Sequence, residues 1–186
     1  MDELFHYGVK GMKWGVRRYQ NKDGSLTTEG KNRLVYISRA RRANRTKDKM
    51  DKLYSTLSDD DKRLLGDDEA AKEWLTKEAG EYVVKRFLKE VGDEPVAAMD
   101  IMTTTKKGSY TVAIMTNPKY RGKGHAYELA QKGVSWYDKN KDKLEANVLT
   151  WNAYQDNEAS RKIAEKLGFK YNKKKSNKNW AAYDHK

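Results

Sequence analysis

The sequence of 186 residues contains no cysteine, two prolines and three histidines. Without cysteine the chain can form no disulfide, no thiolate zinc site and no cysteine nucleophile. The histidines, His6, His125 and His185, are scattered along the chain, which predicts no metal site. No apolar run approaches the length that spans a bilayer, and the first residues lack the apolar stretch of a signal peptide. We therefore expect a cytoplasmic protein without a membrane partner.

Positive charge is abundant but unevenly distributed. The formal net charge is +12, of which residues 1–57 contribute +8 and residues 171–186 contribute +4, while residues 58–170 carry equal numbers of acidic and basic side chains. A neutral body with basic ends argues against a dedicated nucleic-acid-binding domain. The basic ends are still expected to attract nucleic acid or another anionic surface in a salt-dependent way.

A strand, a glycine loop and a helix follow one another in the second half of the chain. The β-branched run 109–116 predicts a buried strand, Pro118 and two glycines follow it, and the apolar positions after Ala126 suit one face of a helix. Glycine lets a backbone turn freely, and the first N–H groups of a helix have no intrahelical acceptor. With Arg121 and Lys123 beside it, this arrangement predicts a phosphate-binding site.

Two motifs carry a resemblance to a known family. The first is Arg121-Gly-Lys-Gly-His-Ala126, and the second is Asn157-Glu-Ala-Ser160 followed by Glu165-Lys-Leu-Gly-Phe169. In this order they resemble the two signatures of the GCN5-related N-acetyltransferases (the GNAT family), and the resemblance covers roughly residues 49–186. It implies an α+β acyl-CoA N-acyltransferase fold, with flanking helices and a mixed, mostly antiparallel sheet that contains one splayed parallel pair of strands.

The rest of the sequence predicts the elements of such a fold. Ser58 is expected to cap a short helix with an acidic first turn, and another helix is expected over 68–79. Strands are expected over 82–91, 95–102, 109–116 and 144–151, with edge strands over 169–173 and 179–183. Helices are expected from Gly122 to Asn140 and over 157–167, with Gly168 as a C-cap. No clear strand precedes the first helices, where the family has one, and residues 34–37 are a poor candidate.

The resemblance also implies where acetyl-CoA, the family's acyl donor, would bind. Backbone groups of Ile114, Met115 and Thr116 would pair with the pantetheine arm. Asn157 would hydrogen-bond the same arm, with helix capping as its alternative role, and Ser160 would face the cofactor or form a local cap. The diphosphate would lie on the N–H groups of the loop. The loop residues are Arg121, Gly122, Lys123, Gly124, His125 and Ala126.

The catalytic groups depart from the family pattern. The position of the family's common tyrosine acid, just before Glu165, is Ala164 here, and the nearest tyrosines are Tyr154 and Tyr171. We take Tyr154 as the candidate acid. The cofactor strand carries no carboxylate, so we take Asp100 on the preceding strand as the candidate base, with a solvent-facing strand residue as the alternative interpretation.

The N-terminal residues form a separate segment rich in glycine and aromatic side chains. The string His6-Tyr-Gly-Val-Lys-Gly-Met-Lys-Trp-Gly-Val-Arg-Arg-Tyr19 resembles a short segment that precedes unrelated domains in phage and prophage structural-region proteins. The resemblance implies a portable element that associates with capsid or head proteins, whereas an arm packed on the protein's own body is the alternative. We expect this segment over 1–32, a basic helical linker over 33–48 and an acetyltransferase domain over 49–186.

Three functions remain open. The first is a phage- or prophage-encoded N-acetyltransferase acting on a primary amine of a protein or small molecule. The second is a non-catalytic, CoA-binding fold that serves as a virion or assembly component. The third is a toxin-like acetyltransferase that is directed at charged tRNA by the basic ends. The fold does not name the acceptor.

Overall fold

The computed structural model describes residues 19–21, 23–63, 65 and 83–186, without the side chains of residues 39, 40 and 42. The helix expected over 68–79 and most of the expected N-terminal segment lie outside these residues. The chain divides into two compact units, Met1–Arg45 and Thr46–Lys186, which are considered separately.

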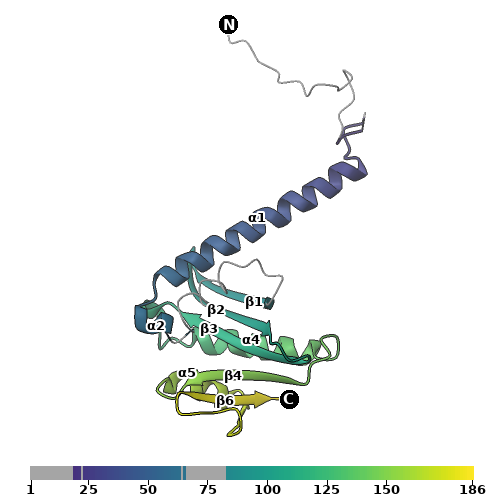
Figure 1. Cartoon of the computed structure of the whole chain (residues 1–186). Coiled ribbons are helices and arrows are strands. Elements are labelled where there is room, and N and C mark those ends of the chain that lie inside the picture. The colour runs from purple at the N-terminus through teal and green to yellow at the C-terminus, as the bar shows by residue number, and fades with distance from the viewer. Residues whose placement is uncertain (1–18, 22, 64, 66–82) are drawn as a thin grey trace. The chain divides into compact units, whose positions relative to one another are not determined.

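In the first unit, a short loop leads into the long helix α1 (Thr28–Ser55), whose last turns belong to the second unit (Figure 1). Gln20 and Leu26 form an isolated bridge around the turn that the sequence predicts. Thr27 Oγ1 accepts a hydrogen bond from the N–H of Gly30 at 3.1 Å and so caps the helix. The helix continues without a break through residues 32 and 48, where the expected segments meet.

A six-stranded sheet dominates the second unit, in the order β1-β2-β3-β4-β6-β5. All neighbouring strands are antiparallel except β3 and β4, and this mixed sheet with flanking helices confirms the predicted α+β fold. Among the described residues no strand precedes α1, since residues 34–37 lie inside that helix. The strands are β1 (Val83–Val91), β2 (Glu94–Thr103), β3 (Ser109–Thr116), β4 (Val148–Tyr154), β5 (Lys170–Tyr171) and β6 (Trp180–His185).

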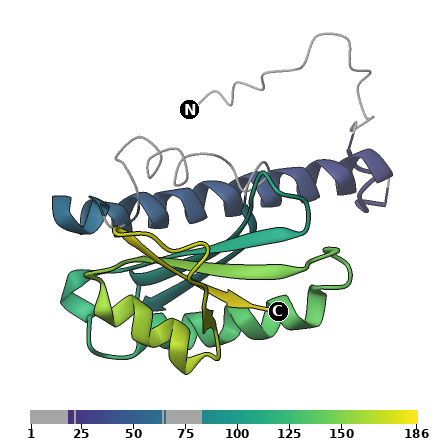
Figure 2. The ribbon, with the colours of Figure 1, turned by 60° about the horizontal axis from the view of Figure 1, so that its bottom comes forward.

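Helices cover both faces of this sheet. α4 (His125–Asn140) and α5 (Glu158–Lys166) lie on one face, where Met99 belongs to the main hydrophobic core (Figure 2). The last turns of α1 lie on the other face, where Met50 packs with Ala98. Successive side chains of β2 therefore pack on opposite faces of the sheet, because side chains alternate between the two faces along a strand.

The short helix α2 (Asp59–Arg63) begins where the sequence predicts. Ser58 Oγ accepts from the N–H of Asp61 at 3.2 Å, and Asp61 Oδ2 accepts from the N–H of Ser58 at 3.2 Å and from its hydroxyl at 2.9 Å. This reciprocal capping box gives acceptors to two amides at the start of the helix. It also fixes the Asp61 side chain, which is 13% exposed.

Two predicted strands are wrong in position. Residues 144–147 lie before β4 and do not form its first half. Leu144 and Glu145 end a turn, in which the N–H of Ala146 bonds to the carbonyl of Lys141 and Glu145 has a φ of +48°. The strand expected over 179–183 is not at the edge of the sheet. β6 pairs with β4 along all of its six residues, and the two-residue strand β5 forms the edge.

Candidate functional site

The parallel strands β3 and β4 are joined over only part of their length. Four residue pairs are in register, from Ser109↔Val148 to Val112↔Trp151. Beyond this point, counting the described residues, the rest of β3 (113–116) pairs only with β2, and residues 152–154 of β4 pair only with β6. The two strands thus separate toward their C-terminal ends and leave two unpaired backbone edges between them. We call this opening the fork.

Ile114, Met115 and Thr116 form the β3 arm of the fork. The Ile114 side chain packs against the main core, and the Met115 side chain packs in the second cluster with the end of α1. These side chains pack on the two faces of the sheet. The edge of the arm that borders the fork therefore presents backbone N–H and C=O groups.

The turn after β3 is fixed by Asn117 and Glu94. Asn117 is 3% exposed and accepts from the N–H of Lys119 at 3.1 Å, which starts the 3₁₀ helix η1 (Pro118–Tyr120). The hydroxyl of Tyr120 donates to Glu94 Oε2 at 2.6 Å. This bond raises the pKa of Tyr120 and lowers the pKa of Glu94, so the pair stays intact at neutral pH.

Gly122 and Gly124 shape the loop between η1 and α4. Their φ angles are +75° and +80°, in the left-handed region that favours glycine. α4 therefore begins at His125 rather than at Gly122 as predicted, and Gly124 occupies the N-cap without a side-chain hydrogen bond. Beyond its chain neighbours, a Cβ atom at either glycine would have no heavy atom of the described residues within 4 Å, so these residues leave open space beside the loop.

The amides of this loop have no acceptor in the part of the chain that the structure describes. Among the described residues, the N–H groups of residues 122–127 donate no hydrogen bond. The first N–H groups of a helix carry its positive dipole end, and successive amides in such a turn form a concavity that attracts anions. The backbone of residues 122–127, which we call the nest, therefore has the geometry of an anion site at the end of the β3 arm.

Side chains around the nest add to its positive charge. Arg121 Nη2 lies 2.6 Å from Asp61 Oδ1 of α2. Lys123 Nζ lies 4.8 Å from the centre of the Tyr120 ring, and it forms no ion pair with any described residue. Burial and nearby lysines lower the pKa of His125, so this side chain is mostly neutral at pH 7 and contributes little charge.

On the β4 side of the fork, Asn157 and Ser160 have local partners. Asn157 Oδ1 accepts from the N–H of Ser160 at 3.1 Å and caps α5, which is the alternative role expected for it. Ser160 Oγ accepts from the indole N–H of Trp151 at 2.9 Å. Both residues lie at the start of α5, close behind the end of β4 in the chain.

The two candidate catalytic residues differ in their surroundings. Asp100 is 0% exposed and accepts three hydrogen bonds from Arg86, at 2.9, 3.0 and 2.6 Å, so the interpretation of a solvent-facing residue is wrong. Its neighbour on β3 is Ala113, the first residue beyond the paired part. Tyr154 ends the β4 arm, and its ring lies on Trp180 with 3.7 Å between ring centroids.

The position of the family's tyrosine lies in the core. Ala164 is 0% exposed and belongs to the main cluster under α5. Tyr171 is 53% exposed on the edge strand β5 and packs against Tyr183. Of the two tyrosines considered from the sequence, only Tyr154 lies on an arm of the fork.

Sequence reasoning missed three residues that hold candidate site residues in place: Asp61, Arg86 and Glu94. The contact between Arg86 and Asp100 could have been predicted from the sequence, because a hairpin around the predicted turn at Gly92 places Arg86 opposite Asp100. No local signal predicts the contacts of Asp61 and Glu94, since Arg121 and Tyr120 lie far from them in the chain. Within the described residues, no cluster of side chains could hold a metal ion, and no helix could cross a membrane.

Comparison with protein families identifies the class of this chain. The acetyltransferase (GNAT) domain matches residues 41–170, which is more than half of the chain. The chain belongs to the GNAT family of acetyltransferases. A family of unknown function (DUF7211) matches residues 1–21, and this match neither supports nor opposes the expected phage association. No curated protein shows a significant match.

Solved structures agree with this family. An acetyltransferase from Agrobacterium tumefaciens has a TM-score of 0.56 and 15% identity, covering 77% of this chain and 84% of that one. A GNAT acetyltransferase from Bacillus anthracis has a TM-score of 0.54 and 20% identity, covering 74% and 87%. The aminoglycoside acetyltransferase AAC(6')-Ib in complex with coenzyme A has a TM-score of 0.56 and 15% identity, covering 75% and 89%. At these identities the similarity shows the fold.

Proposed function

We propose that this protein is an N-acetyltransferase that moves the acetyl group of acetyl-CoA to a primary amine. The observation that carries the proposal is the fork with its nest, in which the short helix η1 connects an unpaired strand edge to a row of amides that have no acceptor among the described residues. Membership of the GNAT family supports acyl transfer. The coenzyme A complex of AAC(6')-Ib supports a CoA-type donor for this fold.

Different groups of the chain would bind different parts of acetyl-CoA. The nest amides of residues 122–127, with Arg121 and Lys123, would hold the diphosphate. The backbone at Ile114–Thr116 would pair with the pantetheine arm as a strand edge pairs with an extended ligand, and Asn157 and Ser160 would contact the arm from α5. The open space beside both glycines suits a ligand that approaches the backbone closely.

Acetyl transfer by these residues would need no covalent enzyme intermediate. The amine nitrogen attacks the thioester carbonyl carbon, the C–S bond breaks, and the proton on nitrogen passes to a base as the sulfur leaves. A backbone N–H of the β3 arm would stabilise the oxyanion. We propose Asp100 as the base and Tyr154 as the acid. A thiolate leaves without a positioned acid, so alanine at position 164 does not prevent turnover.

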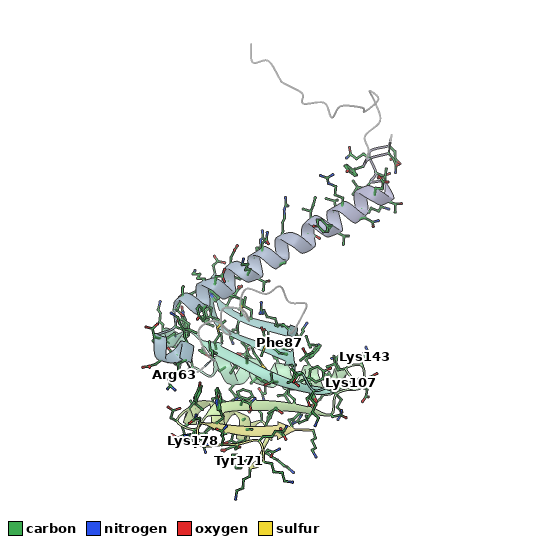
Figure 3. The ribbon with its side chains drawn as sticks, in the orientation of Figure 1. Arg63, Phe87, Lys107, Lys143, Tyr171 and Lys178 are labelled. Carbon is green, nitrogen blue, oxygen red and sulfur yellow. The ribbon has the colours of Figure 1, made fainter. Side chains whose placement is uncertain are left out.

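Calorimetric titration with acetyl-CoA tests the donor site. The wild-type protein is expected to bind, and Arg121→Glu is expected to weaken binding by about 10- to 100-fold, because it places a negative charge beside the diphosphate. Lys107→Glu is the matched control, since Lys107 is 89% exposed in the turn at the opposite end of β3 (Figure 3). No heat of binding at millimolar acetyl-CoA would overturn the proposal.

The second candidate is a CoA-binding fold without catalysis, which would serve as a virion or assembly component. It is favoured by two observations: Ala164 is a core residue, and both oxygens of Asp100 are occupied by Arg86. Under this proposal the segment 1–32 would attach to capsid or head proteins. Binding of acetyl-CoA without hydrolysis or transfer to a panel of amine-bearing peptides would favour it over the enzyme.

The basic part of α1 supports a proposed nucleic-acid contact. Residues 30–47 contain seven basic residues and no acidic one. We expect tRNA to bind this region weakly, with an affinity that falls steeply as salt increases, because counterions are released from the phosphates. Arg41→Gln together with Arg45→Gln, two exposed helix positions, should weaken binding and flatten the salt dependence in a filter-binding assay. Salt-independent binding, or binding that the double variant leaves unchanged, would contradict this expectation.

A further inference from the structure

Helix α2 contacts the loop that follows the β3 arm and the end of the β4 arm. On the β3 side, Asp61 Oδ1 lies 2.6 Å from Arg121 Nη2, next to the nest. On the β4 side, the guanidinium of Arg63 lies 5.1 Å from the centre of the Tyr154 ring, and its Nη2 lies 3.5 Å from Asp156 Oδ2. Figure 3 shows Arg63 extending from α2 toward the layer of β4 and β6. Two side chains of one helical turn therefore link the loop after β3 to the end of β4.

Asp61 is suited to hold Arg121. The carboxylate is 13% exposed and already fixed by the Ser58 capping box, whereas the Arg121 side chain is 49% exposed. Burial acts to raise the pKa of Asp61, but hydrogen bonds from Arg121 and Ser58 outweigh it and lower the pKa, so the carboxylate is charged at neutral pH. The contact through Nη2 leaves further N–H donors of the guanidinium for an anion.

Arg63 acts on the other arm in a different way. Its guanidinium covers one side of the Tyr154 ring, and that ring also stacks on Trp180. The ion pair with Asp156 is exposed on both sides and contributes little by itself.

We propose that α2 is a polar clamp across the open end of the fork, in which Asp61 and Arg63 are positioning residues. Asp61 aims Arg121 at the nest, so that the arginine is ordered before the diphosphate arrives, and Arg63 holds Tyr154 at the end of β4. The inference rests on the proposed function, because it names what orients the arginine of the proposed donor site. The two residues act on different arms, so their effects are separable.

Titration with acetyl-CoA tests the β3 side. Asp61→Asn keeps the shape of the side chain and is expected to weaken binding about 5- to 10-fold, because Arg121 must then be ordered on binding. Asp59→Asn removes the same charge from the same helix at a fully exposed position and should leave the affinity within about twofold. In an Arg121→Gln background, Asp61→Asn should cause no further loss, since it acts through that arginine.

Other outcomes of this titration are decisive. If Asp61→Asn leaves the affinity unchanged, or raises it because a competing carboxylate has gone, the inference is overturned while the donor site stands. If the wild-type protein binds no acetyl-CoA, both the inference and the proposed function fail. Equal losses from Asp59→Asn and Asp61→Asn would show a diffuse charge effect and would also overturn the clamp.

The contact between Arg63 and Tyr154 on the β4 side can be measured without an activity assay. With 3-fluorotyrosine incorporated at position 154, the ¹⁹F resonance is expected to shift and broaden in Arg63→Gln and to recover in Arg63→Lys, which keeps a cation over the ring. Lys62→Gln, on the same helix beside Tyr54 rather than Tyr154, should leave the resonance in place. A resonance that Arg63→Gln does not move would overturn this half of the clamp.

Discussion

Replacing Gly124 by valine is expected to abolish acetyl-CoA binding, with a loss of affinity of about 100-fold or more. Gly124 has a φ of +80° at the N-cap of α4, and apart from its chain neighbours the described residues place no heavy atom within 4 Å of the position of its Cβ. That open space borders the unused amides of the nest. Valine would fill it with apolar atoms and would strain the turn by roughly 1–2 kcal/mol. Calorimetric titration measures the loss.

Gly168→Val provides the control for strain. Gly168 has a φ of +82° and, among the described residues, equally open space around its Cβ, but it follows the C-terminal end of α5 and is not part of the nest. Both variants are expected to lower Tm by a similar amount, about 2–8 °C, because both place a branched side chain in a left-handed conformation. Only Gly124→Val should lose acetyl-CoA. If the two variants bound it equally, the nest would not be the diphosphate site.

Replacing Arg86 by methionine is expected to lower the free energy of unfolding by about 3–5 kcal/mol. The Arg86 guanidinium donates three hydrogen bonds to Asp100, which is 0% exposed. Methionine occupies a similar volume but leaves the buried carboxylate without its guanidinium, and a buried charge without its partner is costly. Urea denaturation followed by tryptophan fluorescence measures the difference.

The double variant Arg86→Met/Asp100→Leu separates structure from catalysis. It removes both charges together, so it is expected to be more stable than Arg86→Met alone. A double variant as unstable as the sum of the two single variants would contradict this account of the pair. If Asp100 is the base, the double variant should fold and bind acetyl-CoA but lose turnover. Acetyl transfer at the wild-type rate would remove Asp100 from the mechanism.

Local signals explain which features the sequence could predict. The turn residues at Gly92, Gly122 and Gly124 adopt positive φ, and Ser58 caps α2, because each depends on a few consecutive residues. The start of β4 is not predictable in this way. Apolar side chains before it also pack against the core, yet their backbone forms a turn, so burial does not distinguish turn from strand.

The sequence by itself determined the family, the α+β class and the succession of strand, glycine loop and helix that forms the nest. The tertiary structure alone decided that β6 lies inside the sheet and that both oxygens of Asp100 bond to Arg86. It also decided that Asp61 and Arg63 of α2 contact Arg121 and Tyr154. The physical reason is the separation along the chain of the residues that determine each feature. Backbone conformation and capping depend on neighbours in the chain, whereas ion pairs and strand order depend on distances between segments that only the folded packing brings together.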